Sequence, residues 1–414
     1  MKHITTLVYL LLLFPFLNSC SNSNITDTPA SDIELDLKSK QIVEADNAFG
    51  FDIFKEVNTE LGEGKNLMIS PLSISLALAM AYNGADGDTK TQMEVMLHKA
   101  GLSAEEINKA YKTLINELAS HDPKVELSIA NAIFYHENFS VKPDFITTNQ
   151  NYYDAEVEAL NFTNSTATLD RINGWVKDKT RDKIEKIIEQ LSPNAVMYLI
   201  NAIYFNGKWT YQFDKDKTSD RTFTTENGTE LQAPTMKLDK TTLNYTSTDK
   251  FQLIELPYGS KKYSMLIFLP NEEVATNDII ANMNETNMKN WLDNLHESSF
   301  QVYLPKFEFA YGNSLADNLK SLGMLDAFEP SLSDFSEISD RSDLYISEVK
   351  HKSYIKVDEE GTEAAAVTSV GFVTSSIEAE PVFDVNRPFV FAIREKDTNA
   401  LLFMGKVNNP LLNN

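Results

Sequence analysis

The segment of residues 359–389 constrains the fold of this chain more than any other, because it begins like a buried strand and continues as a long run of small residues. Between residues 362 and 374 every second position is small or apolar, and the positions between them include Glu363 and Ser369. Side chains alternate between the two faces of a strand, so one face of this segment would be buried and the other solvated. Within this segment no proline precedes Pro381. Such a segment can join a sheet as an additional central strand.

The start of this segment resembles the hinge and reactive loop of a known family, the serpins. The hinge residues are Glu359, Glu360, Gly361, Thr362, Glu363, Ala364, Ala365 and Ala366. Further motifs of the family occur in its order and with similar spacing, from about residue 42 onward. They are Asn66-Leu67-Met68-Ile69-Ser70-Pro71-Leu72-Ser73, Asn173-Gly174-Trp175-Val176, Asn201-Ala202-Ile203-Tyr204-Phe205-Asn206-Gly207-Lys208-Trp209, Glu255-Leu256-Pro257-Tyr258, Leu304-Pro305-Lys306-Phe307, Asn386-Arg387-Pro388-Phe389 and Leu402-Phe403-Met404-Gly405. One hinge alone is weak evidence, but the ordered set is specific.

The resemblance implies a mixed α/β fold of the α+β, multidomain-like serpin type, with three β-sheets, about eight or nine helices and an exposed reactive loop. The residues support parts of it directly. Ser70 and Pro71 are an N-cap and a first-turn proline before an apolar run that ends at Asn83-Gly84, which predicts a buried helix over residues 71–83. Residues 169–188 read as an amphipathic helix and residues 345–358 as an alternating strand.

Composition bounds the organisation and the partners. The chain has 414 residues with 42% hydrophobic content, and we find no internal linker or repeat, so residues 42–414 are expected to form one large domain. The formal net charge of −23 argues against a nucleic-acid partner, and no Lys/Arg cluster indicates activation by a heparin-like polyanion. A monomer is expected.

The N-terminus reads as a targeting segment. An apolar run from Leu7 to Leu17 follows two polar residues and suits a secretory signal peptide over residues 1–19. Leu17-Asn18-Ser19-Cys20 resembles a bacterial lipobox, although Asn18 is unusual there, and Cys20 is the only cysteine. We expect lipidation at Cys20, a flexible tether over residues 20–41 and a place in the cell envelope, on the outer membrane with a periplasmic or surface face. An ordinary signal peptide with a chance cysteine, giving an extracellular protein, is the alternative.

Catalytic motifs are missing from the sequence. It has no Gly-x-Ser-x-Gly elbow, no His-Glu-x-x-His helix, no phosphate loop and no paired-cysteine metal site. His136 lacks a second ligand at helical spacing. We therefore expect no enzyme, no cofactor and no metal.

The resemblance implies two groups of polar residues near the place where the loop would insert. The first is a hydrogen-bonded cluster of Ser70, Ser73, Asn201 and His351, in which plain structural satisfaction explains Ser73 equally well. The second holds the hinge, where Glu359 would meet Lys306, with Trp209 beneath the entry point; an ordinary core tryptophan is the alternative for Trp209.

The bond that a protease would cut is predicted from two counts that disagree. Counting forward from Glu359 by the usual serpin spacing places it between Ser375 and Ser376, and counting back from Pro388 gives Ile377. We prefer the count from the hinge, because insertion length is measured there. Residues 362–375 would extend over about 45 Å as a strand. Thr374 and Phe372 remain alternatives for the cut.

The loop has no Lys or Arg near this bond, so trypsin-like proteases are poor candidates. Elastase-like or subtilisin-like serine endopeptidases suit it better, and Phe372 keeps chymotrypsin-like and cysteine endopeptidases open. The resemblance implies suicide inhibition through a covalent acyl complex with the target protease. The alternative is a serpin-fold binding protein that does not inhibit. A surface adhesion or glycan-handling lipoprotein would suit the anchor but not the hinge.

Overall fold

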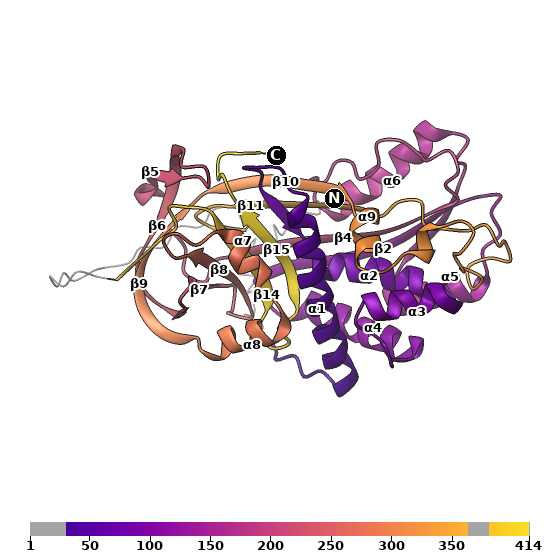
Figure 1. Cartoon of the computed structure of the whole chain (residues 1–414), viewed down its shortest axis with the longest axis horizontal. Coiled ribbons are helices and arrows are strands. Elements are labelled where there is room, and N and C mark those ends of the chain that lie inside the picture. The colour runs from indigo at the N-terminus through magenta and orange to yellow at the C-terminus, as the bar shows by residue number, and fades with distance from the viewer. Residues whose placement is uncertain (1–29, 363–380, 414) are drawn as a thin grey trace, which may run out of the picture.

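The computed structural model describes residues 30–362 and 381–413. These residues form nine α-helices and two hydrogen-bonded sheets, which confirms the mixed α/β class (Figure 1). No helix among them combines the length and apolar character that a membrane crossing requires. The helices are α1 (Leu37–Thr59), α2 (Pro71–Tyr82), α3 (Gly87–Met96), α4 (Ala104–Ser120), α5 (Pro143–Tyr153), α6 (Ser165–Lys179), α7 (Thr276–Ala281), α8 (Glu285–Asp293) and α9 (Ala316–Ser321).

The larger sheet has nine strands in the order β1-β15-β14-β8-β7-β6-β9-β13, with β5 paired to β6. Every residue of its strands β8, β14 and β15 is buried, so these strands form the centre of the core. The strands are β1 (Leu67–Ile69), β5 (Ser219–Thr224), β6 (Glu230–Ser247), β7 (Phe251–Tyr258), β8 (Tyr263–Pro270), β9 (His296–Pro305), β13 (Val382–Asp384), β14 (Phe389–Glu395) and β15 (Leu401–Val407).

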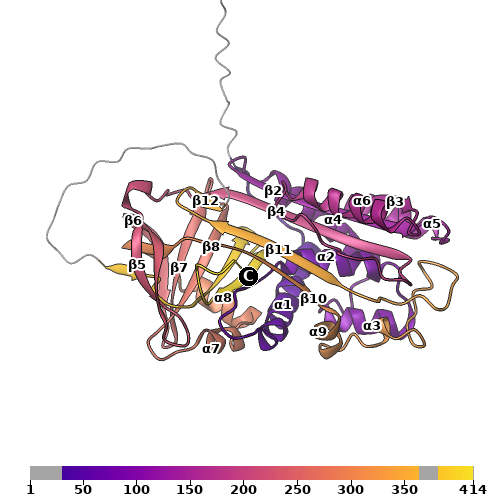
Figure 2. The same cartoon turned by 90° about the horizontal axis from the view of Figure 1, so that it is seen from above.

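The smaller sheet has six strands in the order β10-β11-β12-β4-β2-β3. Its strands are β2 (Val125–His136), β3 (Glu156–Leu160), β4 (Met197–Lys208), β10 (Phe307–Ser314), β11 (Lys350–Val357) and β12 (Gly361–Thr362). In Figure 2, β2, β4 and β11 run along the length of the molecule. Helices α2 and α6 both contact β4. The sheet is therefore covered by helices where β4 lies at its centre.

Three sheets were expected, and the described residues form two. Strand β6 is 18 residues long and pairs with β5 along its first part and with β7 along its last part. Strand β9 pairs with β6 across both parts, with a register shift between Leu238 and Thr241. Two groups of strands that would otherwise be separate sheets are thereby continuous.

Helix α2 follows from its sequence. The Ser70 side chain accepts a hydrogen bond from the Ser73 N–H, and Pro71 occupies the first turn, where no N–H partner is needed. Apolar residues lie on all sides of the helix, which is typical of a fully buried helix. The prediction is confirmed, with the helix ending one residue earlier than expected.

Two other predicted elements are shorter than expected. Helix α6 ends at Lys179, because Arg181 and Asp182 adopt positive φ angles of 51° and 64° that a helix cannot continue through. Strand β11 begins at Lys350 rather than at residue 345. The chain before it bonds elsewhere, since the Ile346 N–H donates to the Ala327 carbonyl and the Leu315 N–H donates to the Val349 carbonyl.

Candidate functional site

The candidate site is the space between β4 and β11 in the smaller sheet. Strand β4 is paired with β2 from Met197 to Gly207 on one side, but on its other side, among the described residues, only Gly207 and Lys208 are paired, with β12. Strand β11 pairs with β10 along its whole length and, within the described ranges, with β12 only at Val357. In the described part of the chain no ladder joins β4 to β11 directly. Unpaired strand edges of this kind accept an added strand.

Where the hinge enters this space, its Gly361 lies against Gly207 of β4. Gly361 has a φ of 154°, and a Cβ built on it would lie 2.1 Å from the Gly207 carbonyl oxygen. A Cβ on Gly207 would in turn lie 2.8 Å from the Phe205 ring. Neither position therefore has room for a side chain, and the close approach lets β12 pair with both neighbours.

Glu359 is held at the entrance by two partners. The Lys306 ammonium lies 2.8 Å from one carboxylate oxygen, and the Thr218 hydroxyl donates to the other at 2.7 Å. Burial works to raise the pKa of Glu359, but the hydrogen bonds from Lys306 and Thr218 outweigh it and hold the pKa below its ordinary value. Lys306 is more than a third exposed, so this contact positions the hinge rather than adding much stability.

Trp209 lies under the hinge and binds it through the backbone. Its N–H donates to the Glu360 carbonyl at 2.9 Å, and its indole N–H donates to the Asp358 carbonyl at 2.9 Å. The ring stacks on Tyr258 with centroids 4.3 Å apart. The Tyr258 hydroxyl lies 2.7 Å from the Thr362 hydroxyl. Thr362, the last described hinge residue, is thus buried and bonded to the core.

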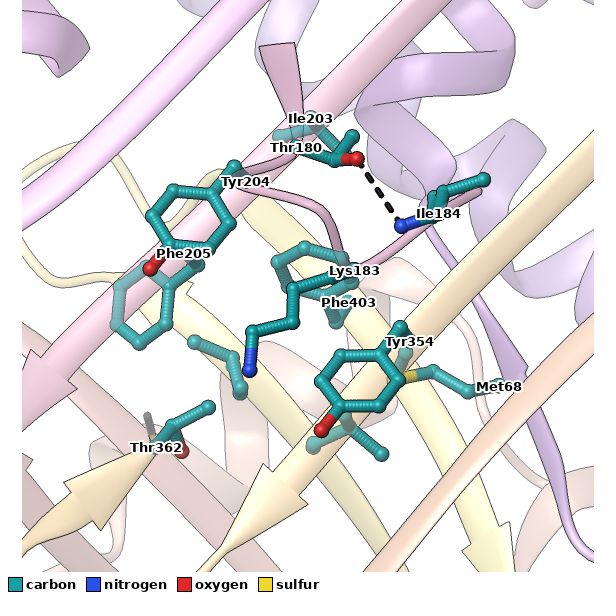
Figure 3. Close-up of a pocket in the computed structure, with 12 residues that line it drawn as sticks. Met68, Thr180, Lys183, Ile184, Ile203, Tyr204, Phe205, Tyr354, Thr362 and Phe403 are labelled. Carbon is teal, nitrogen blue, oxygen red and sulfur yellow. Dashed lines mark hydrogen bonds between the residues drawn. The ribbon is translucent and has the colours of Figure 1, made fainter. Parts of the chain in front are cut away.

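A small pocket continues from Thr362 between the two strands, as Figure 3 shows. Its volume is about 20 Å³, room for roughly one water molecule. Tyr204 and Phe205 of β4 line one side and Tyr354 of β11 the other. Lys183, from the chain that follows α6, also lines this pocket. Its ammonium lies 5.2 Å from the centre of the Tyr354 ring. The pocket thus lies next to Thr362, the last described residue of the hinge.

Farther along the same space, His351 bonds to the start of α2. Its Nε2 accepts a hydrogen bond from the Ser70 N–H at 3.2 Å, while the Ser70 hydroxyl donates to the Leu402 carbonyl at 2.7 Å. Burial lowers the pKa of His351 to about 4, so the ring is neutral at neutral pH and able to accept. The hydroxyl of Ser353, two residues along β11, donates to the Met68 carbonyl.

Asn201 bonds away from the other members of the expected cluster. Its amide donates to Asn131 on β2 at 2.8 Å, and the Asn131 amide donates to the Tyr153 carbonyl. Its own carbonyl oxygen is buried without a partner among the described residues. Asn201 faces β2 because those two strands are in register at this pair. Ser73, Asn201 and His351 nevertheless line one cavity of about 590 Å³ between β4 and the chain before β11.

Comparisons with known proteins decide the family. A family model described as Serpin (serine protease inhibitor) matches residues 44–410. The chain is a serpin. Serpins are mainly inhibitors rather than catalytic enzymes, and they bind target proteases.

Three relatives illustrate the range of similarity. Human Serpin B8 is 34% identical over 376 residues, covering 89% of this chain and 99% of its own. The native state of the thermophilic serpin tengpin superposes with a TM-score of 0.82 at 36% identity, covering 93% of this chain and 97% of that one. Human thyroxine-binding globulin, in complex with its ligand, superposes with a TM-score of 0.81 at 29% identity, covering 90% and 99%.

Several predicted residues of this serpin lie outside the described part of the chain. They are Cys20, the later hinge residues Glu363, Ala364, Ala365 and Ala366, and the candidate cleavage residues Phe372, Thr374, Ser375, Ser376 and Ile377. For these the sequence predictions stand as predictions. Of the remaining predicted residues, the structure brings Glu359 to Lys306, Trp209 to the hinge and His351 to Ser70, and it separates Asn201 from that cluster.

Sequence reasoning missed two contributors. Gly207 and Tyr258 contact the hinge directly, and both belong to motifs noticed in the sequence without an assigned role. The sequence placed Glu360 in the hinge without a partner, and its buried carboxylate pairs with Lys215. The signal for Gly207 and Tyr258 was present, but only the fold shows what they touch.

Proposed function

We propose that this serpin inhibits serine endopeptidases as a suicide substrate, with its reactive loop entering the sheet between β4 and β11. One observation carries the proposal: Gly361 and Thr362 pair with β4, and Thr362 also pairs with β11, at one end of a space whose remaining strand edges are unpaired among the described residues. An inserted loop would complete the hydrogen bonds of both edges, which supplies a driving force for insertion.

The alternation of small side chains along the loop suits the space between β4 and β11. Thr362 is buried against Tyr258, so the residues at the same phase, Ala364 and Ala366, would face the core next. Small side chains can enter a closing gap without burying charge. Strand β4 has 12 residues and spans about 40 Å, close to the roughly 45 Å expected for residues 362–375. Insertion to Ser375 would therefore fill the length of β4.

The target protease would supply the catalytic groups for this reaction. The protease serine oxygen would bond to the carbonyl carbon of Ser375, and the amide nitrogen of Ser376 would leave with a proton, giving an acyl-enzyme. Insertion would then carry the attached protease along β4 before water can cleave the ester. The residues near the bond suit elastase-like and subtilisin-like enzymes, with a cysteine endopeptidase as a second class through Phe372.

The test is the formation of an SDS-resistant complex with an elastase. Wild-type protein should form it, and Thr362→Arg and Ala366→Arg should be cleaved as substrates instead, because each places a charge on the buried face. Ser369→Arg is the matched control, since it puts the same charge on the solvated face and should keep inhibition. A covalent complex formed by both buried-face variants would contradict the insertion mechanism. Mass spectrometry of the released fragment identifies the cut bond.

A second candidate function is binding without inhibition, which the similarity to thyroxine-binding globulin favours. Thermal unfolding before and after loop cleavage separates the two functions. Insertion should raise the melting temperature strongly after the cut, because the β4 and β11 edges become paired. An unchanged melting temperature would leave the binding role.

We also propose that the chain is exported and anchored by lipid at Cys20, so that it meets proteases at the cell envelope. The apolar run and the single cysteine support this. Mature protein should start at a lipid-modified Cys20, and Cys20→Ala should move from the membrane fraction to the soluble one. We further propose that it acts as a monomer and without a heparin-like activator, in line with its charge of −23.

A further inference from the structure

Three side chains from distant parts of the chain converge beside the turn between β14 and β15. His121 caps the C-terminal end of α4, Glu395 is the last residue of β14, and Asp397 lies in the turn. The His121 Nε2 lies 3.2 Å from a Glu395 carboxylate oxygen and 3.4 Å from an Asp397 oxygen. One ligand atom from each residue lies within 4.8 Å of the other two.

The histidine at this convergence is buried and unsatisfied. The side chains of His121 and Glu395 are both 0% exposed, and that of Asp397 is 23% exposed. Among the described residues, neither ring nitrogen of His121 has a hydrogen-bond partner. Buried polar atoms are rarely left so, because each costs the desolvation of the group. Nε2 therefore lies within 3.4 Å of two carboxylate oxygens without a hydrogen bond to either.

The carboxylates are held in place by other donors. Glu395 accepts from the Asp397 N–H on one oxygen and from the Thr398 N–H and hydroxyl on the other. Asp397 accepts from the Ile33 N–H at 3.0 Å and from Lys262 at 2.8 Å, both on Oδ2, the oxygen that lies 3.4 Å from His121 Nε2. These donors fix the orientation of the two carboxylates.

The charges around this cluster leave a negative excess. Lys262 contacts Asp397 and also Asp32, so it serves two carboxylates. The one ion-pair partner of Glu395 in the described part of the chain is His121, which is neutral unless protonated. A buried carboxylate without a compensating cation is costly. The cluster needs a further positive charge.

We propose that His121, Glu395 and Asp397 form a binding site for a divalent transition-metal ion, with Zn²⁺ as the preferred ion. Tetrahedral Zn²⁺ with bonds of about 2.0 to 2.1 Å holds its ligand atoms about 3.3 Å apart. The distances of 3.2 and 3.4 Å from Nε2 match that spacing. Imidazole nitrogen and carboxylate oxygen are both accepted ligands of Zn²⁺. The exposed side of Asp397 is the route of entry.

The ion would join three parts of the chain. The Ser31 N–H donates to the His121 carbonyl and the Ile33 N–H donates to Asp397, so the first described residues of the chain lie against the site. Zn²⁺ would tie them and the end of α4 to the β14–β15 turn. Motif spacing does not reveal this site, because its ligands come from residues 121 and 395–397.

The test uses the untagged full chain, freed of metal by a chelator and dialysed, then titrated with Zn²⁺ by calorimetry. One Zn²⁺ should bind per chain and raise the melting temperature, whereas Mg²⁺ should do neither. Asp397→Asn should weaken Zn²⁺ binding by at least about tenfold. The matched control is Asp52→Asn, because Asp52 is an exposed carboxylate 2.9 Å from His98 and its loss should leave Zn²⁺ binding unchanged.

A second readout needs no variant. Co²⁺ added to the metal-free wild-type protein should give the intense visible absorption of a tetrahedral site, and Zn²⁺ should abolish it. The proposal is overturned if wild-type protein shows no saturable binding of Zn²⁺, or if Asp397→Asn binds it as tightly as wild type does. Stabilisation by acid alone, without any effect of Zn²⁺, would also overturn it and assign the cluster to a protonated histidine between two carboxylates.

Discussion

The two sheets of this serpin differ in how their central strands are closed. In the larger sheet β14 is paired on both sides, with β15 and β8, and all three strands are buried throughout. In the smaller sheet, as far as residues 30–362 and 381–413 show, β4 and β11 are linked only through the two residues of β12. The central strands of the larger sheet are paired on both sides, whereas β4 and β11 of the smaller sheet keep unpaired edges in the described part of the chain. Under the proposed insertion mechanism, the larger sheet supplies stability and the smaller sheet is the one that changes.

The largest effect is expected from a cavity in the closed sheet. Phe391 on β14 is 0% exposed, and Phe391→Ala should lower the free energy of unfolding by about 3 to 5 kcal/mol. Urea unfolding measures this. Ile203→Ala, beside the space next to β4, is the comparison, and it should cost clearly less because Ile203 is only partly buried. Equal losses of unfolding free energy in the two variants would contradict the difference in burial between the two sheets.

The next effect concerns pH. Burial lowers the pKa of His351 to about 4 in the folded state, against about 6.5 when unfolded. Between these values the unfolded chain binds more protons, so stability contributed by neutral His351 is present above pH 6.5 and is lost as pH falls towards 4. The loss is on the order of 3 kcal/mol. Unfolding measured across this range should show a flatter profile for His351→Gln than for the wild-type protein, and an equally steep profile would contradict the burial effect.

A smaller effect is expected where the hinge enters. Gly361→Ala places a Cβ 2.1 Å from the Gly207 carbonyl oxygen at a φ of 154°, so β12 should be expelled from between β4 and β11 at a cost of about 2 kcal/mol. Gly64→Ala is the control, because its φ is also positive, at 71°, but its Cβ would meet no atom within 4 Å. Its cost should be about 1 kcal/mol. If Gly361→Ala and Gly64→Ala lose the same unfolding free energy, the close contact of Gly361 with Gly207 contributes nothing beyond backbone strain.

The smallest effect on stability belongs to Glu359→Gln. Because Lys306 is more than a third exposed, the change should cost about 0 to 1 kcal/mol. Its visible consequence should be faster proteolysis close to residue 359, since the Lys306 and Thr218 contacts position the hinge. The control is Glu105→Gln on α4, whose carboxylate pairs with the exposed Lys109. Unchanged proteolysis in Glu359→Gln would show that the contact does not hold the hinge.

The features that were predictable from the sequence are local or carried by motifs. The capped start of α2 depends on Ser70 and Pro71 alone, and the contact of Glu359 with Lys306 followed from the family resemblance. The start of β11 was missed because residues 345–349 bond to distant parts of the chain. The partner of Asn201 was missed for the same reason, since strand register places Asn131 beside it. The convergence of His121 with Glu395 has no local signal at all.

Hydrogen exchange before and after the loop is cut tests the central claim most directly. The account predicts that backbone amides on the open edges of β4 and β11 become protected once residues 363–375 are cleaved free and insert, while amides of β8 and β14 keep the protection they already have. Mass spectrometry of peptides from β4, β11, β8 and β14 measures the exchange of each strand separately. Unchanged exchange in β4 and β11 after complete cleavage would contradict insertion between them.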